Sequence, residues 1–185
     1  KEPEFLKEGL VYEYSFDGET SVSERDSVVL DVAGLPDGNA PRTFSIWVES
    51  KVNQSEAVII ARWNIENPNQ IENRGHFGFS YYKNNICGWS ANAIKSAYTN
   101  TRLPFSRKIN LVQVYNGVTL QVYIDGELKV KVKGTLQTNP AKGIILRGTT
   151  RWHKSFVGSI DDIRIYNRAL SHEEVKALYE FEKAN

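Results

Sequence analysis

Two tight-turn signals in the second half of the chain place the strongest limits on its fold. Asn116-Gly117 and Asp125-Gly126 are residue pairs that accept the positive φ angles of a two-residue hairpin turn. In the segments 118–124 and 127–133, apolar residues stand at every second position. This period is typical of strands in a sheet with one solvent-facing side. Together with 109–115, these segments predict three antiparallel strands in a meander.

Similar segments elsewhere predict further strands. In 43–49, Phe44, Ile46 and Val48 share one face and Trp47 lies on the other, where we expect it to pack under the second sheet or a helix. The remaining strand candidates are 10–16, 57–63, 75–82, 143–147 and 156–166. Roughly ten or more short strands separated by polar turns predict an all-β fold, a two-sheet antiparallel β-sandwich.

One short helix is predicted at the C-terminus. Ser171 and Glu174 form an S-x-x-E capping box, which satisfies the free N–H groups at the start of a helix. Val175, Leu178 and Tyr179 then fall on one face. Because the segment is short and terminal, we expect it to close the sandwich. No internal linker or repeat interrupts the sequence, so residues 1–185 are predicted to form a single domain.

Composition argues against several classes of protein. The net charge of +1 gives no general electrostatic grip on nucleic acid. No apolar run approaches the ~20 residues that a membrane span needs, so we predict no membrane insertion. The single Cys87 cannot form an internal disulfide and is predicted to be a small buried side chain. The chain starts at Lys1 without an initiator Met, and we interpret it as part of a larger multidomain protein.

Several motifs in the right order resemble one known family. They are the strand 43–48 (TFSIWV), the hairpin 120–126 (LQVYIDG) and the long closing segment 156–175, while 10–18 resembles an opening strand. Together they resemble the laminin-G-like jelly roll of the concanavalin A-like superfamily, in the form common in bacterial secreted proteins. At 108–112 the chain has KINLV where the family often has W-H-H-V-A. The resemblance implies a jelly-roll sandwich and an extracellular or cell-surface location.

An acidic pair lies inside the closing segment. Asp161 has the strand parity of Ile163 and Ile165, so we expect it to point toward the apolar side and Asp162 to point away. Related folds often hold a structural calcium through an aspartate at this place, together with carbonyls near the N-terminal strand. The resemblance therefore implies Asp161 as a calcium ligand, with Asp17 or nearby carbonyls as partners. Alternatively, Asp161 accepts backbone N–H or arginine hydrogen bonds, and Asp17 is only a turn residue.

Aromatic and polar residues predict a glycan-binding face. A sugar ring offers an apolar C–H surface to aromatic rings and hydroxyl groups to polar side chains. Trp152 lies in a polar loop where no core requirement explains it, although its ring could also fold down onto the sheet. For Trp63 and Trp89 a role in the core is the favoured reading, with ligand binding as the alternative. The predicted ligand-binding residues are Arg62, Trp63, Asn64, Arg74, His76, Tyr82, Trp89, Arg151, Trp152 and His153.

Catalytic signatures are missing from the sequence. The retaining machinery of β-glucan-cleaving enzymes in this superfamily is E-x-D-x-x-E on one strand. The nearest approach, Glu24-Arg25-Asp26, is followed by Val29 where the second Glu should stand. We therefore predict that the chain is not an enzyme but a non-catalytic carbohydrate-binding, lectin-like module of a secreted or cell-surface protein, with a glycan or polysaccharide as partner. The alternative is a structural or adhesion domain that mediates protein–protein contact, and a glycoside hydrolase is the third reading.

Overall fold

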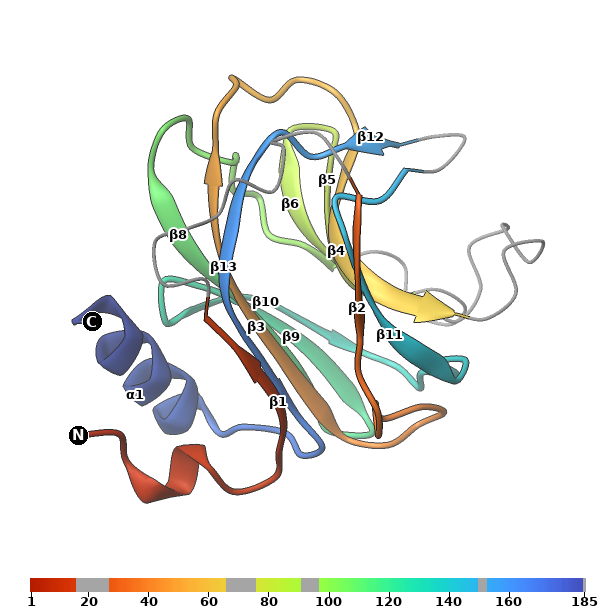
Figure 1. Ribbon diagram of the computed structural model, residues 1–185, viewed down its shortest axis with the longest axis vertical. Helices are drawn as coiled ribbons and strands as arrows, with labels where there is room; N and C mark the ends of the chain where they lie inside the picture. Colours follow the sequence, from red (N-terminus) through yellow and green to blue (C-terminus); the bar gives the residue numbers. More distant parts are fainter. Residues whose placement is uncertain (16–26, 66–75, 91–96, 150–152, 185) are drawn as a thin grey trace.

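Two sheets face each other in the computed structural model, which describes residues 1–15, 27–65, 76–90, 97–149 and 153–184 (Figure 1). Sheet A has the strand order β1-β13-β3-β8-β9-β10, and sheet B has the order β2-β11-β4-β5-β6-β7, with β12 paired in parallel to β4. The strands of sheet A are β1 Leu10–Tyr14, β13 Gly158–Tyr166, β3 Arg42–Ser50, β8 Lys108–Tyr115, β9 Thr119–Ile124 and β10 Glu127–Lys133. Those of sheet B are β2 Val28–Asp31, β11 Ala141–Leu146, β4 Val58–Ile65, β5 Phe77–Tyr82, β6 Asn85–Ser90, β7 Ala97–Tyr98 and β12 Lys154–Ser155.

The predicted two-sheet sandwich and its meander β8-β9-β10 are confirmed. Asp125 and Gly126 join β9 to β10 with positive φ angles of 51° and 77°. The turn at Asn116 and Gly117 is one residue longer than predicted. Val118 belongs to this loop and is 53% exposed, instead of lying on the buried face of β9.

Sequence reasoning missed β2, β6, β7 and β12. The β5–β6 hairpin turns at Lys83 and Asn84, whose φ angles are 49° and 62°. These are the angles of a two-residue turn, but the pair contains no glycine to signal it.

The main core fills the space between the two sheets. Phe44, Ile46 and Val48 of β3 point into it, as predicted. The Phe44 ring lies 5.1 Å from the ring of Trp63 and 5.3 Å from that of Phe79, both on sheet B. These contacts join the sheets through dense aromatic packing, which sheet-on-sheet arrangements require.

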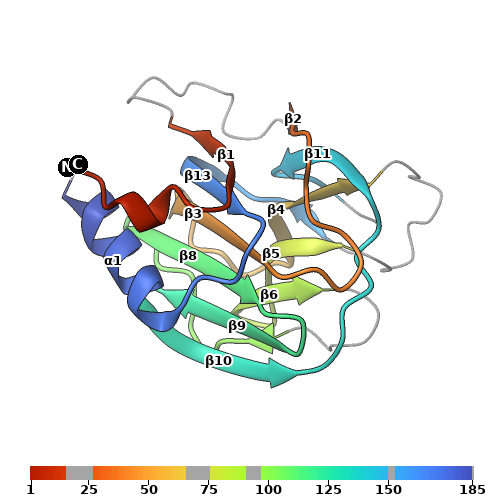
Figure 2. The same ribbon diagram turned by 90° about the horizontal axis from the view of Figure 1, so that it is seen from below.

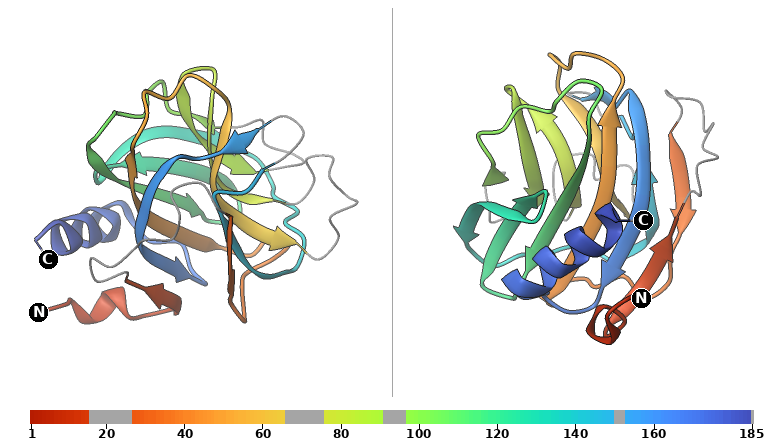
Figure 3. Two further views of the ribbon diagram at one scale, coloured as in Figure 1. Left: turned by 45° about the horizontal axis from the view of Figure 1, so that its top comes forward. Right: turned by 90° about the vertical axis from the view of Figure 1, so that its left-hand side faces the viewer.

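A second, smaller core covers the outer side of sheet A. Helix α1, His172–Lys183, packs Val175 and Leu178 there, and the 3-10 helix Glu4–Leu6 adds Leu6. Figures 2 and 3 show α1 and the N-terminal segment on this same side of the molecule. The capping box of Ser171 with Glu174 is present, as predicted. In the described part of the chain, no helix has the length and apolar character to cross a bilayer.

Candidate functional site

The outer face of sheet B is the side that points away from sheet A. Phe77, Phe79 and Tyr81 of β5 point into the core. Because side chains alternate along a strand, Ser80 and Tyr82 belong to the outer face. The register pairs Ile59 of β4 with Ser80 and Arg62 of β4 with Gly78. The outer face of sheet B therefore carries Arg62 and Tyr82 on neighbouring strands.

Arg62 and His76 contact each other at this face. Arg62 Nη1 lies 3.1 Å from His76 Nδ1. His76 is only 5% exposed, and burial together with the nearby Arg62 charge lowers its pKa to about 4. The imidazole is therefore neutral at neutral pH. Because a guanidinium has donors only, Arg62 donates and His76 accepts through Nδ1.

Arg62 itself is partly buried. Burial lowers its pKa from the ordinary arginine value. Its Nε is buried and has no hydrogen-bond partner among the residues that the structure describes. An ideal Cβ on Gly148 would lie 3.7 Å from this nitrogen, so the segment after β11 passes close beside it.

Tyr82 and His153 form a second pair on the same side. Their ring centroids are 6.0 Å apart with the planes inclined by 51°. Tyr82 is 37% exposed, and the Lys83 ammonium lies 5.4 Å from the centre of its ring. Tyr98 of β7 is equally exposed and lies beside Cys87 of β6, whose partner on β5 is Ser80. Two exposed tyrosines, Tyr82 and Tyr98, thus lie on the outer face of sheet B.

The predicted ligand-binding residues fall into three groups. Arg62, His76, Tyr82 and His153 come together at the outer face of sheet B. Trp63 is 0% exposed in the main core, where its Nε1 donates to the Pro36 carbonyl at 3.2 Å, so it takes the core role that the sequence also allowed. The others lie outside the described residues, or have side chains that do: Arg74, Arg151 and Trp152, and the side chains of Asn64 on β4 and Trp89 on β6.

Sequence reasoning did not find Tyr98. It stands in the two-residue strand β7, and nothing in the pattern around it indicates a strand or a surface. Cys87 is buried, as predicted, and burial raises the pKa of its thiol to about 12.

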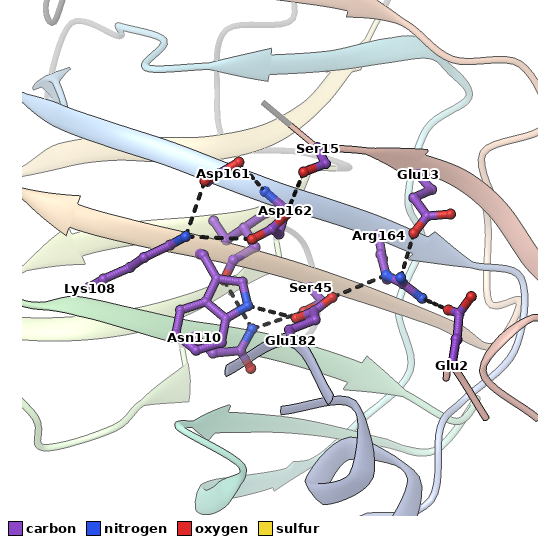
Figure 4. A network of polar contacts seen from close by, with 12 residues as sticks. Glu2, Glu13, Ser15, Ser45, Lys108, Asn110, Asp161, Asp162, Arg164 and Glu182 are labelled. Carbon is purple, nitrogen blue, oxygen red and sulfur yellow. Dashed lines mark hydrogen bonds and ion pairs between the residues drawn. The ribbon is translucent and has the colours of Figure 1, made fainter. Parts of the chain in front are cut away.

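A separate polar network lies between sheet A, the N-terminal segment and α1 (Figure 4). Arg164 of β13 forms ion pairs with Glu2, Glu13 and Glu182, and its side chain is only 7% exposed. Trp47 Nε1 donates to Glu182 Oε2 at 2.7 Å, and the Trp47 ring stacks on a tyrosine of α1 at 5.7 Å. This confirms that Trp47 packs under the helix. The network anchors both ends of the chain to sheet A.

The predicted orientation of Asp161 is wrong. Ile160 and Ile163 both point into the main core although two residues separate them, whereas regular alternation leaves only one residue between inward-facing neighbours. The pairing of β13 with β3 shows the reason. Asp161 pairs with Trp47 and Arg164 with Ser45, so two residues of β13 lie opposite a single residue of β3. Asp162 occupies this bulge with a φ of 45°. Asp161 therefore faces the outer side of sheet A, with Trp47.

Lys108 occupies the space between the two aspartates (Figure 4). Its Nζ lies 3.1 Å from Asp161 Oδ2 and 3.5 Å from Asp162 Oδ2, while Ser15 Oγ donates to Asp162 Oδ1 at 2.9 Å. Asp17 lies outside the described residues. Among the residues described, no three His, Cys, Asp or Glu side chains gather as a metal site. The oxygen donors suit calcium chemically, but the Lys108 ammonium already shares them.

The fold defines a lectin-type jelly roll, with two antiparallel sheets and a closing helix. Residues 22–176 match the model of the concanavalin A-like lectin/glucanases superfamily, and the chain belongs to this family. No curated protein sequence matches it.

Solved structures with the same fold come from larger carbohydrate-active proteins and toxins. Domain 4 of AbnA, a GH43 extracellular arabinanase from Geobacillus stearothermophilus solved with arabinotriose, is 18% identical (TM-score 0.67, covering 92% of this chain and 98% of that one). The receptor-binding domain of botulinum neurotoxin D is 16% identical (TM-score 0.64, 92% and 48%). Trypanosoma rangeli sialidase is 19% identical (TM-score 0.62, 95% and 33%). The chain thus spans about half of the toxin domain and a third of the sialidase. At such identities these similarities show the fold alone.

Proposed function

We propose that this chain is a non-catalytic carbohydrate-binding module that binds glycan at the outer face of sheet B. The observation that carries the proposal is the meeting of four predicted residues on one face. Arg62, His76, Tyr82 and His153 come from three different segments of the chain, yet they form two contacting pairs there. Exposed tyrosine rings offer stacking surface to a sugar, and arginine and histidine offer hydrogen bonds to its hydroxyl groups.

The strands that carry the candidate residues contain no carboxylates, which supports a binding role over a catalytic one, and Asp31 of β2 is a single acidic residue at the edge of this face. Most retaining and inverting glycosidases use two Asp or Glu residues at the cleaved bond. The strands β4, β5, β6, β7, β11 and β12 contain no Asp or Glu in their sequences. The E-x-D-x-x-E motif is also missing from the whole chain. This set of side chains therefore supports binding of a glycan without its cleavage.

The structural neighbours are consistent with such a role in a larger protein. One of them is a separate domain of an extracellular arabinanase, solved with a bound oligosaccharide. By analogy of fold, we propose an extracellular or cell-surface location for this chain, as a module attached to other domains. This analogy does not identify the sugar that the module binds.

An adhesion role is less well supported. A protein-binding surface would show contiguous exposed apolar residues. Among the described residues, the exposed large apolar side chains are spread over separate elements: Tyr14, Val29, Val52, Tyr82, Tyr98, Phe105, Val118 and Leu128. Single apolar side chains of this kind are ordinary on protein surfaces.

Replacing Tyr82 by alanine tests the proposed function. A glycan array would first identify a ligand, and isothermal titration would then compare the variants. We expect Tyr82→Ala to weaken binding by roughly 2- to 12-fold, the range of one aromatic contact. The melting temperature should hardly change, because the ring is 37% exposed. Tyr14→Ala, which removes a similarly exposed ring from sheet A, is the matched control. An array without any bound glycan, or unchanged binding in Tyr82→Ala, would refute the proposal.

Calcium binding by Asp161 and Asp17 is a second proposal, with Lys108 as the competing cation. We expect calcium to raise the melting temperature above its value in chelator. Lys108→Met should enlarge this rise because it frees the Asp161 and Asp162 oxygens, whereas Asp161→Asn should abolish it. Lys131→Met, on exposed β10, is the control for loss of a lysine charge. Equal melting temperatures with calcium and chelator, in both the native chain and Lys108→Met, would contradict calcium binding.

A further inference from the structure

We propose that Arg62 makes the outer face of sheet B selective for acidic sugars, because its guanidinium binds the carboxylate of a uronic acid or a similar sugar acid. The inference rests on the proposed glycan-binding function and names the class of ligand.

Among the described residues, Arg62 has no acidic partner. It forms no ion pair with them, whereas Arg164, whose side chain is 7% exposed, forms three. Within the part of the chain that the structure describes, its guanidinium is hydrogen-bonded to the neutral ring of His76 and its buried Nε has no partner. A desolvated guanidinium is costly unless an anion or several hydrogen-bond acceptors satisfy it, as four backbone carbonyls do for the buried Arg42. A ligand carboxylate would supply the missing partner.

His76 holds the guanidinium in place without neutralising it. A carboxylate at this position would pair with Arg62 and remove its ability to attract an anion. The neutral imidazole instead accepts one N–H at 3.1 Å and leaves the positive charge uncompensated. Because a bidentate carboxylate contact needs a guanidinium of fixed orientation, this hydrogen bond prepares the site.

The surroundings of Arg62 suit an anion attached to a longer glycan. Gly78 lies beside it, and a Cβ there would come within 2.6 Å of Arg62 Cα, so no side chain can stand at this position. Tyr82 follows four residues later on the same face of β5, about 13 Å along a strand that rises about 3.3 Å per residue. An acidic sugar at Arg62 and another ring at Tyr82 would therefore belong to one oligosaccharide.

Trigalacturonate and its fully methyl-esterified form provide the test, because they share a backbone and differ in charge. We expect the native chain to bind trigalacturonate about tenfold or more tightly than the ester, with a preference that weakens in salt. Arg62→Gln should remove this preference, and Arg62→Lys should restore only part of it. Arg102→Gln, at an exposed arginine that contacts Asn84, is the matched control and should keep the preference.

The His76 ring gives an independent readout by NMR. A carboxylate bound at Arg62 offsets the charge that helps to hold the His76 pKa near 4, so the pKa should rise when trigalacturonate binds. Arg62→Gln should abolish the response to ligand. Melting temperatures of the variants would show that each is folded.

The outcomes separate this inference from the proposed function. Equal affinity for the acid and its ester, or a preference that survives in Arg62→Gln, overturns the acidic-sugar assignment while glycan binding stands. Binding of inorganic phosphate without trigalacturonate also overturns it. If no oligosaccharide binds but monomeric galacturonate shifts the His76 pKa only when Arg62 is present, the carboxylate site is supported and the glycan-binding function fails.

Discussion

Replacing Arg42 by methionine is expected to lower the free energy of unfolding by about 3–5 kcal/mol. The Arg42 side chain is 0% exposed. It donates hydrogen bonds of 2.9–3.0 Å to four backbone carbonyls of the loop that precedes β3, those of Pro36, Asp37, Gly38 and Ala40. Its guanidinium also lies 5.3 Å from the ring centre of Phe77, on the opposite sheet.

The size of this effect follows from what methionine would leave behind. It has a similar length and fills much of the space, but it cannot donate to the four carbonyls. The carbonyls of Pro36, Asp37 and Gly38 keep a second donor in Trp63 Nε1, the Ala40 N–H and the Thr138 N–H, so the cost comes from the lost charge-assisted hydrogen bonds rather than from unpaired carbonyls. Urea unfolding would measure the change, with Arg102→Met as the control that stays within about 0.5 kcal/mol. A loss below about 1 kcal/mol for Arg42→Met would show that water replaces the guanidinium.

Arg164→Met is expected to cost about 3–5 kcal/mol at pH 8 and distinctly less at pH 5. The change leaves Glu2, Glu13 and Glu182 around an uncharged side chain. Glu182 is the most buried of them, at 4% exposed, and burial raises its pKa to about 7 in spite of hydrogen bonding from Trp47 and the charge of Arg164. Arg164 Nε lies 3.1 Å from Glu182 Oε1, in an ion pair whose geometry leaves that oxygen without a hydrogen bond.

The pH dependence follows from the direction of this shift. A carboxyl whose pKa is raised on folding binds a proton more readily in the folded chain. Its contribution to stability is complete below its ordinary pKa of 4.5 and is lost as the pH rises through about 7. Without Arg164 the Glu182 pKa rises further, so the variant loses more stability over the same pH range.

A double variant isolates this effect. Arg164→Met with Glu182→Gln removes the titrating carboxyl, so the difference between pH 5 and pH 8 should shrink. Arg107→Met, which breaks an exposed ion pair with Asp125, should cost at most about 1 kcal/mol at either pH. Guanidinium chloride is a salt and would screen ion pairs, so urea should be used as the denaturant. An Arg164→Met loss that is independent of pH would refute the assigned role of Glu182.

Much of the fold could be predicted because its signals are local. The Asp125-Gly126 turn, the alternation along β9 and the Ser171–Glu174 capping box each depend on a few adjacent residues. The outward Trp47 among inward neighbours also followed from alternation. By contrast, the Lys83-Asn84 turn adopts the same angles without glycine, which is why β6 was missed.

The candidate site could be predicted in part. Arg62 and Tyr82 lie on β4 and β5, which follow each other in sequence, and His76 directly precedes β5, so a cluster was foreseeable from their spacing. His153 reaches Tyr82 only through the crossing of β12 beside β4, which no local pattern contains. Whether Trp63 faces a ligand or the core depended on the opposite sheet, where the Phe44 ring packs against it.

Alternation, turn chemistry and helix capping are properties of neighbouring residues, and they determined the sandwich, its meander and its closing helix from sequence alone. The direction of Asp161 was decided by the tertiary structure, because an extra residue in β13 reverses the strand parity and is visible only in its pairing with β3. The same holds for Arg62, which has no acidic partner among the described residues, because burial and the distance between segments follow from packing, and packing depends on the whole chain.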